Sequence, residues 1–138
     1  GDFFLRDTER KIVCIAGGSG MAPIKSILHD MLEKGTNRHV EYFFGAVTKA
    51  DLFLVDEMKS LEEKLPDFTF VPALSAPKEE DEWEGETGLI TEVLDRHMEN
   101  GDNTEAYLCG SPGMIAASIQ VLSELGMKTE NIFYDSFA

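Results

Sequence analysis

Short apolar runs alternate along the chain with amphipathic stretches of helical period. Runs rich in β-branched and aromatic residues predict buried strands at residues 11–16, 39–44, 68–74, 106–109 and 131–134. Apolar residues at helical spacing predict helices at residues 24–32, 52–65, 89–97 and 112–125. Strands that alternate with helices in this way are typical of a parallel sheet that helices cover on both faces.

The pattern therefore predicts an α/β fold with a doubly wound, five-stranded parallel sheet in the order 3-2-1-4-5. In such sheets ligands bind beyond the carboxyl ends of the strands, where the strand order reverses. This point lies between the first and the fourth predicted strand, and a glycine-rich loop follows each of these two strands. The coincidence favours a nucleotide site at this edge of the sheet.

The first loop reads Gly17-Gly18-Ser19-Gly20-Met21-Ala22-Pro23. Glycines permit a tight turn and let a ligand approach the backbone closely. A proline suits the first turn of a helix, where free N–H groups and the helix dipole favour a pyrophosphate. The alternative is a plain strand-to-helix turn, because the loop lacks the third glycine of GxGxxG and the GK[ST] of a Walker loop.

The second loop reads Cys109-Gly110-Ser111-Pro112-Gly113-Met114. It follows the same order of strand end, small residues and helix start, with Ser111 as the expected N-cap. For Cys109 the alternative is a small buried residue without a role in a site. Two such loops at one switch point favour a nucleotide site over a chance turn.

Composition and charge limit the function. The formal net charge is −14 and there is no basic stripe, which excludes a nucleic-acid binder. No apolar stretch approaches the length of a membrane span and no signal-peptide pattern opens the chain, so we expect a soluble domain. Cys14 and Cys109 show neither a CxxC nor an iron–sulfur spacing, which fits a reduced, cytoplasmic setting. His29, His39 and His97 lack partners at metal-like spacing, so no metal site is expected.

Both loops resemble signatures of the ferredoxin–NADP reductase superfamily. Residues 18–23 match its GxGxxP motif, and residues 107–114 are similar to its CGPxxM motif, with Ser111 in place of the usual proline. Residues 73–77 and 80–90 resemble the F subunit of sodium-translocating NADH:quinone reductases. The same block, with residues 51–53 and 132–137, also resembles reductase components of multicomponent monooxygenases, and the choice between these branches stays open.

The resemblance implies a domain order and an activity. Residues 1–8 would be the tail of an upstream flavin-binding domain, and residues 9–138 the NAD(P)-binding domain. The parent protein would be an NADH-dependent flavoprotein oxidoreductase, with FAD bound mainly by the upstream domain. Hydride would pass from nicotinamide to flavin, and electrons onward to an iron–sulfur centre in a 2Fe-2S domain or a ferredoxin-like acceptor. The expected location is the cytoplasm or the cytoplasmic face of a membrane, with membrane contact only through segments outside this chain.

Two other functions fit the same fold. The chain could be a non-catalytic, nucleotide-sensing regulatory subunit, although the presence of Cys109 favours the enzyme. It could instead be a flavodoxin-like FMN domain, but such phosphate loops are rich in Ser and Thr, and Ser19 is alone in this one.

The resemblance also assigns site residues. The nicotinamide would lie near Cys109 and Ser19, the candidate catalytic positions, and the pyrophosphate near Gly20 and residues 110–113. Phe137 would lie near the flavin ring, or would simply close the sheet. The full set of expected cofactor-binding residues is Gly18, Ser19, Gly20, Met21, Pro23, Gly45, Val47, Asp51, Ser75, Cys109, Gly110, Ser111, Pro112, Gly113, Met114 and Phe137.

The sequence after the third strand predicts a preference for NADH over NADPH. NADP-specific relatives carry a Ser-Arg pair there, whereas this chain reads Ser75-Ala76-Pro77 and continues into an acidic loop around Trp83. A 2′-phosphate needs a cation, which the acidic residues would oppose. Asp51 could accept hydrogen bonds from the free ribose, or could merely cap the second helix. We expect the loop to be solvated, with Trp83 covering the sheet edge.

Overall fold

The computed structural model describes residues 3–18, 21–52 and 55–136. Its strands are β1 (Lys11–Gly17), β2 (Val40–Ala46), β3 (Phe68–Leu74), β4 (Glu86–Thr87), β5 (Thr104–Gly110) and β6 (Ile132–Ser136). Its α-helices are α1 (Met21–Lys34), α2 (Val55–Lys64), α3 (Ile90–His97) and α4 (Pro112–Glu124). Short 3₁₀ helices are η2 (Lys49–Asp51), η3 (Glu79–Asp81) and η4 (Thr129–Asn131). None of the helices in these ranges is long and apolar enough to cross a membrane.

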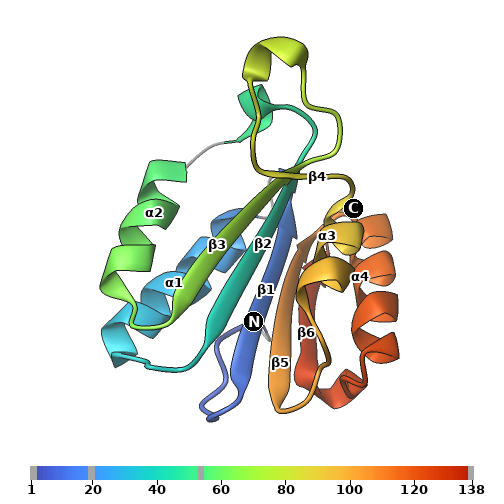
Figure 1. Cartoon of the computed structure of the whole chain (residues 1–138). Coiled ribbons are helices and arrows are strands. Elements are labelled where there is room, and N and C mark those ends of the chain that lie inside the picture. The colour runs from blue at the N-terminus through green and yellow to red at the C-terminus, as the bar shows by residue number, and fades with distance from the viewer. Residues whose placement is uncertain (1–2, 19–20, 53–54, 137–138) are drawn as a thin grey trace.

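The strands form one parallel sheet in the order β4-β3-β2-β1-β5-β6 (Figure 1). This confirms the doubly wound order that the sequence predicts for β3, β2, β1, β5 and β6. The predicted count of five is wrong, because the described residues contain a sixth strand, β4, beside the end of β3. β4 has only two residues, which pair with Ala73 and Leu74. A strand of two residues is too short to show a hydrophobic period. From the sequence, its first residue, Glu86, was expected in the acidic loop around Trp83.

Helices cover both faces of the sheet, as predicted. α1 and α2 pack on one face against a cluster that includes Cys14, Tyr42 and Cys109. α3 and α4 pack on the other face against a cluster that includes Ile15, Phe43 and Leu108 (Figure 1). Successive residues of β1, β2 and β5 alternate between the two clusters, so both sides of these strands are buried. This explains why they read as continuous apolar runs.

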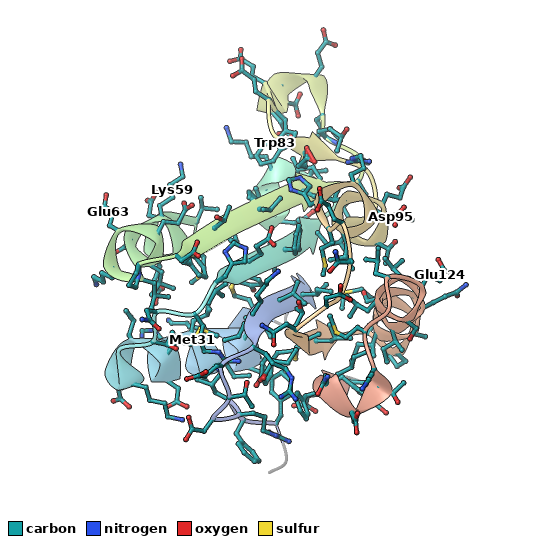
Figure 2. The ribbon with its side chains drawn as sticks, turned by 60° about the horizontal axis from the view of Figure 1, so that its bottom comes forward. Met31, Lys59, Glu63, Trp83, Asp95 and Glu124 are labelled. Atoms are coloured by element: carbon teal, nitrogen blue, oxygen red, sulfur yellow. The ribbon has the colours of Figure 1, made fainter. Side chains whose placement is uncertain are left out.

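The outer faces of the helices carry the charge. Figure 2 shows Lys59 and Glu63 on α2, Asp95 on α3 and Glu124 on α4, all of them exposed. Met31 on α1 is fully buried. The helices are therefore amphipathic, and their apolar stripes hold them to the sheet.

One predicted helix differs from the structure. Residues 52–65 carry a helical pattern, and the described part of the helix, α2, spans Val55–Lys64, but Leu52 is not helical. Leu52 has an extended backbone, with φ −82° and ψ 127°, and ends the short helix η2. Its side chain still packs against the core on the α1 side. An apolar residue in the right place for a helical period can therefore reach the core from a loop.

The N-terminal segment, defined as residues 3–10, crosses the α1 face of the sheet where no described helix covers it. Leu5 is buried in the core of that face. The ring of Phe3 meets the ring of Tyr107 on β5 edge-on, at 6.1 Å between centroids. The guanidinium of Arg6 lies 4.1 Å from the ring centroid of Phe133 on β6. The segment thus takes the place of a helix over β5 and β6. The proposed domain boundary after residue 8 stays a prediction.

A charged pair lies beneath this segment. The side chain of Glu105 on β5 is fully buried, and Nη2 of Arg38 lies 3.0 Å from its Oε1. The hydroxyl of Thr8 donates to Oε1 of Glu105, and the hydroxyl of Tyr107 donates to its Oε2. A buried carboxylate needs such partners, since burying an unpaired charge costs several kcal/mol (roughly 3–5). We call this group the Arg38–Glu105 anchor.

We predict that Glu105→Gln lowers the free energy of unfolding by about 3 kcal/mol, because it leaves the Arg38 guanidinium buried without a counterion. The matched control is Glu57→Gln, which breaks an ion pair with Lys25 at the surface and should cost much less, since water screens that pair. Urea unfolding followed by circular dichroism measures both values. Equal losses in the two variants would contradict the prediction.

Candidate functional site

A cleft of about 1000 Å³ opens beyond the carboxyl ends of β1, β2 and β3, at the start of α3 and α4. It lies where the strand order reverses, between β1 and β5. The predicted site residues that line it are Gly18, Gly45, Val47, Asp51, Ser75, Ser111, Pro112 and Met114. The structure therefore brings these residues to one hollow, while their roles in binding stay predictions.

Six further residues line the cleft that the sequence did not assign to the site: Gly17, Ala46, Ala50, Gly88, Leu89 and Ile90. Three of these form the start of α3, which follows the unpredicted strand β4. The signal that could have found them is Gly88 directly before an apolar helical pattern. Its φ of 109° is a backbone conformation that favours glycine.

Glycines let the helices approach the strand ends. A Cβ on Gly45 would lie 3.0 Å from Cβ of Ile90, at the first residue of α3. A Cβ on Gly17 or on Gly110 would lie 3.1 Å from Sδ of Met114, on α4. These glycines therefore make room for the side chains of Ile90 and Met114, and at Gly18, where a Cβ would meet nothing within 4 Å, the backbone is open to a ligand.

The start of α4 is prepared for an anion. Ser111 is its N-cap, as predicted, and its Oγ accepts a hydrogen bond of 3.3 Å from the backbone N–H of Met114. Pro112 occupies the first helical position. Neither α1 nor α4 has an acidic residue in its first turn, whereas α2 and α3 do. The dipoles of α1 and α4 are thus left uncompensated in a chain that is otherwise strongly acidic.

The remaining predicted site residues lie elsewhere or outside the described residues. Met21 is fully buried under the first loop, where its Sδ accepts a hydrogen bond of 3.1 Å from the hydroxyl of Tyr42. Gly113 lies exposed on α4. Ser19, Gly20 and Phe137 are outside the residues that the structure describes.

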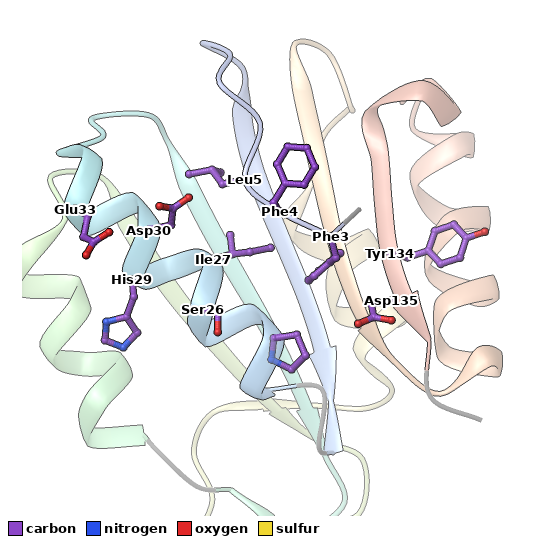
Figure 3. Close-up of a pocket in the computed structure, with 11 residues that line it drawn as sticks. Phe3, Phe4, Leu5, Ser26, Ile27, His29, Asp30, Glu33, Tyr134 and Asp135 are labelled. Atoms are coloured by element: carbon purple, nitrogen blue, oxygen red, sulfur yellow. The ribbon is translucent and has the colours of Figure 1, made fainter. Parts of the chain in front are cut away.

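Cys109 lies on the other face of the sheet from the start of α3. Its side chain belongs to the buried cluster on the α1 side, and it pairs in register with Asp135 on β6. Asp135 lines a groove of about 940 Å³ that runs between α1, the end of β6 and the N-terminal segment (Figure 3). Pro23, another predicted site residue, lines the same groove. The predicted residues therefore divide between the cleft and this groove, which lie on opposite faces of the sheet.

The large apolar side chains that are exposed within the described residues gather at these two hollows. Val47 and Leu89, 55% and 61% exposed, line the cleft. Phe4 and Tyr134, 52% and 57% exposed, line the groove. Exposed apolar surface that is concentrated in hollows is typical of binding sites.

The loops that contain η2 and η3 rise above the sheet (Figure 1), and Ala50 and Asp51 of η2 line the cleft. Oδ2 of Asp81 in η3 accepts hydrogen bonds from the backbone N–H of Lys78, at 2.9 Å, and of Lys49, at 3.3 Å. These bonds lower the pKa of Asp81, the bond from Lys78 first. Trp83 folds back and donates a hydrogen bond of 2.8 Å to the carbonyl of Glu86 on the edge strand β4. Trp83 therefore contacts the edge strand, while its role as a cover of the sheet edge stays a prediction.

Asp51 caps a helix, but not the one that the sequence suggested. Its Oδ2 accepts hydrogen bonds from the backbone N–H and the hydroxyl of Thr48, at 3.0 and 3.1 Å, at the start of η2. Asp51 is exposed and lines the cleft, and its role toward a ligand stays a prediction.

The three histidines all lie beside carboxylates. Nε2 of His29 lies 3.5 Å from Glu57, Nδ1 of His39 lies 3.0 Å from Asp67, and Nε2 of His97 lies 2.9 Å from Glu86. No three His, Cys, Asp or Glu side chains of the described residues form a group that could hold a metal ion.

The doubly wound sheet, the cleft at its switch point and the two helix starts define a nucleotide-binding domain. The chain belongs to the oxidoreductase NAD-binding domain family, whose model matches residues 14–120.

Relatives and solved structures agree with this family. The chain is 42% identical to the F subunit of the Na(+)-translocating NADH-quinone reductase of Idiomarina loihiensis, over 99% of this chain and 35% of the relative. It is 40% identical to the F subunit of the same enzyme of Actinobacillus succinogenes, with the same coverage. The cytochrome P450 reductase GcoB of Amycolatopsis has the same fold, with a TM-score of 0.91 and 28% identity over 99% of this chain and 41% of that one. The ferredoxin reductase in carbazole 1,9a-dioxygenase gives a TM-score of 0.85 and 28% identity over 98% of this chain and 40% of that one. The chain thus spans about a third of the length of the curated relatives, 35%.

Gly18 and Gly113 form a matched pair for testing the first loop. A Cβ would meet nothing within 4 Å at either position, but only Gly18 has a positive φ, of 56°. We predict that Gly18→Ala lowers the free energy of unfolding by about 1 kcal/mol, because L residues are strained there. Gly113→Ala should instead raise it by up to about 1 kcal/mol, since alanine favours a helix. Urea unfolding of both variants checks the opposite signs, and a loss in both would contradict this account.

The raised pKa values of the two buried thiols predict how the free energy of unfolding depends on pH. Burial, and then the charge of Asp135, raise the pKa of Cys109 from about 9 to about 11. Burial also raises the pKa of Cys14. A thiol with a raised pKa stabilises the fold fully below pH 9, and this contribution is lost as the pH rises from 9 toward 11. We expect urea unfolding to show declining stability over this window, with a smaller decline in Cys109→Ala. An unchanged slope in that variant would disprove the assignment.

Proposed function

We propose that this chain is the NADH-binding module of a flavin-dependent reductase. It holds NADH so that the nicotinamide faces the flavin of a neighbouring domain and can pass a hydride to it. The observation that carries the proposal is the cleft at the switch point, which joins the open backbone at Gly18 to the start of α4, a helix without an acidic residue in its first turn. The family of NAD-binding domains supports the same ligand.

The two hollows suggest how the dinucleotide lies. Its adenosine end would occupy the cleft, between Val47 and Leu89, with Oδ1 of Asp51 accepting a ribose hydroxyl. The pyrophosphate would lie over the strand ends at Gly18 and the start of α4, where backbone N–H groups and helix dipoles replace the missing cations. The nicotinamide end would then cross the sheet edge toward Cys109 and the groove. A ligand with two ring systems fits an arrangement of two apolar hollows on either side of a polar edge.

Cys109 would act by position and not as a nucleophile. With a pKa of about 11 its sulfur stays protonated at neutral pH. A neutral, buried thiol beside the ring fixes how closely the nicotinamide can approach. Ser19, which is outside the described residues, would be the second catalytic position. Bound flavin supplies the two-electron chemistry, and this chain orients the donor.

The partners follow from the relatives. Because the curated relatives are about three times as long as this chain, we propose that an FAD-binding domain precedes it and occupies the groove that residues 3–5 line. The groove carries the exposed rings of Phe4 and Tyr134, which suit an apolar domain interface. Electrons would continue to a 2Fe-2S domain or a ferredoxin-like acceptor. The 42% identity to the Idiomarina loihiensis relative favours the quinone-reductase branch, at the cytoplasmic face of a membrane.

The test uses the reductase produced from the full coding sequence. Mixed anaerobically with NADH in a stopped-flow instrument, it should bleach its flavin absorbance in a single turnover. This chain alone should bind NADH weakly in calorimetry and should carry no flavin as purified. Stoichiometric flavin in this chain, or no flavin reduction by NADH in the full reductase, would overturn the proposal. Binding to this chain without flavin reduction would favour the nucleotide-sensing alternative.

We predict that the reductase prefers NADH to NADPH. The cations near the cleft are Lys49 and Lys78. Their backbone N–H groups donate to the carboxylate of Asp81, Nζ of Lys49 donates to its backbone carbonyl, and three further acidic residues flank this aspartate, Glu79, Glu80 and Glu82. Carboxylates repel a 2′-phosphate by about 1 kcal/mol per close pair in water. Ala76 is exposed directly after β3, where NADP-specific relatives carry arginine, so Ala76→Arg should improve kcat/KM for NADPH about tenfold. Steady-state reduction of a dye with each nucleotide measures this, and native preference for NADPH would contradict it.

A further inference from the structure

The Arg38–Glu105 anchor is far from the cleft, at the opposite end of β5, and the nucleotide site does not explain it. Glu105 is the second residue of β5 and is fully buried. The side chain of Arg38 is 9% exposed and lies in the turn between α1 and β2. A buried ion pair contributes little to stability compared with a well-packed apolar pair, so its retention calls for another role.

The donors of Arg38 show what the pair holds. Nε donates to the carbonyl of Arg10 at 2.6 Å, Nη1 donates to the carbonyl of Arg6 at 3.1 Å, and Nη2 donates to the hydroxyl of Thr8 at 2.9 Å. All three acceptors belong to the N-terminal segment. A single guanidinium therefore binds this segment at three points spaced two residues apart.

Glu105 completes the attachment from beneath. Its two oxygens accept hydrogen bonds from Thr8 and Tyr107, and the hydroxyl of Tyr107 in turn accepts a hydrogen bond of 2.8 Å from the backbone N–H of Arg6. Residues 3–10 contain no helix or strand of their own. Their path over β5 and β6 thus depends on these side-chain bonds and on the packing of Phe3 and Leu5.

The same segment forms a wall of the groove. Phe3, Phe4 and Leu5 line it opposite Ser26 and Ile27 of α1 (Figure 3). The groove leads to Asp135, the register partner of Cys109. A shift of the segment would therefore move whatever is joined to it relative to the expected position of the nicotinamide.

We infer that the Arg38–Glu105 anchor is a positioning device, which fixes the connection to the preceding flavin domain and so sets the distance between flavin and nicotinamide. This inference rests on the proposed function. Arg38 and Glu105 touch neither hollow, and they act through the N-terminal segment. Because hydride transfer depends steeply on distance, a loosened connection slows it while nucleotide binding in the cleft stays intact.

The test uses a paired substitution that leaves no unpaired buried charge. In Arg38→Met with Glu105→Gln, the carboxamide can still meet Thr8 and Tyr107, while all three bonds from Arg38 to the segment are lost. The matched control is Lys25→Met with Glu57→Gln, which removes an ion pair of 2.9 Å between α1 and α2 that does not touch the segment. Circular dichroism and the exchange of the Val13 and Cys14 amides confirm that the sheet remains folded in both.

The first measurement is hydrogen exchange in this chain. The amides of Arg6, Thr8 and Arg10 should exchange at least about tenfold faster in the Arg38 and Glu105 double variant than in the native chain or the control. Unchanged exchange of these amides would overturn the inference that Arg38 and Glu105 hold the N-terminal segment. Should the double variant fail to fold, Thr8→Val, which keeps the ion pair, provides the same measurement with a smaller expected effect of about threefold.

The second measurement is single-turnover flavin reduction in the full reductase at saturating NADH. We expect the rate to fall about 10- to 100-fold in the double variant, with the Kd for NADH within about twofold of native and the control unchanged. A native rate in a variant whose segment exchanges quickly would overturn the positioning role. Absence of flavin reduction in the native reductase would instead refute the proposed function, and the exchange data would then decide on the attachment alone.

Discussion

β1 and β5 lie side by side at the centre of the sheet, and the burial of both their faces governs the rest of the structure. Each strand must be covered by helices on two sides, so the chain leaves β1 in one direction and β5 in the other. After β1 the chain turns to α1 on one face of the sheet, and after β5 it turns to α4 on the other face. Both helices begin at the same edge of the sheet. A hollow at this edge is thus a consequence of covering two buried strands, and it is lined by the start of α4 and by Gly18 after β1.

This arrangement also resolves a conflict of charge. A chain with a net charge of −14 repels an anionic ligand at long range, and the Debye length of about 8 Å in physiological salt confines that repulsion to the vicinity of the surface. Close to the strand ends the fields of two helix dipoles dominate, because the first turns of α1 and α4 carry no carboxylate. The acidic residues of the loop around η3 lie on the far side of the strand ends from α4, and in the proposed binding mode they would bear on the choice between nucleotides and not on the pyrophosphate.

Sequence reasoning reached the parts of the fold that depend on periodic burial. It found β1, β2, β3, β5, β6 and their order, because the first four carry apolar runs that are buried between the helix layers and β6 begins with the buried Ile132 and the half-buried Phe133. It missed β4, whose two residues pair only through their backbone, and it extended α2 through Leu52, which contacts the core from an extended loop. For the site, the two glycine loops and the N-cap Ser111 could be identified from the sequence. The start of α3 was not, because it reaches the cleft only through the three-dimensional approach of Ile90 to Gly45. The anchor was equally hidden, since Arg38 and Glu105 are 67 residues apart and each looks like an ordinary surface charge in the sequence.

The state of the two cysteine sulfurs bears on how the domain withstands peroxide, which reduced flavins generate when they meet oxygen. Oxidation of cysteine proceeds through the exposed thiolate, and both Cys14 and Cys109 are buried and protonated. Thioethers need no deprotonation, and Met114 is partly exposed at the wall of the cleft. Its Sδ lies 3.1 Å from the positions that Cβ atoms on Gly17 and Gly110 would take, so a sulfoxide oxygen there would press on the strand ends. Oxidative damage to this domain would therefore begin at Met114, where a sulfoxide narrows the space for the nucleotide, and not with a disulfide or a sulfenic acid.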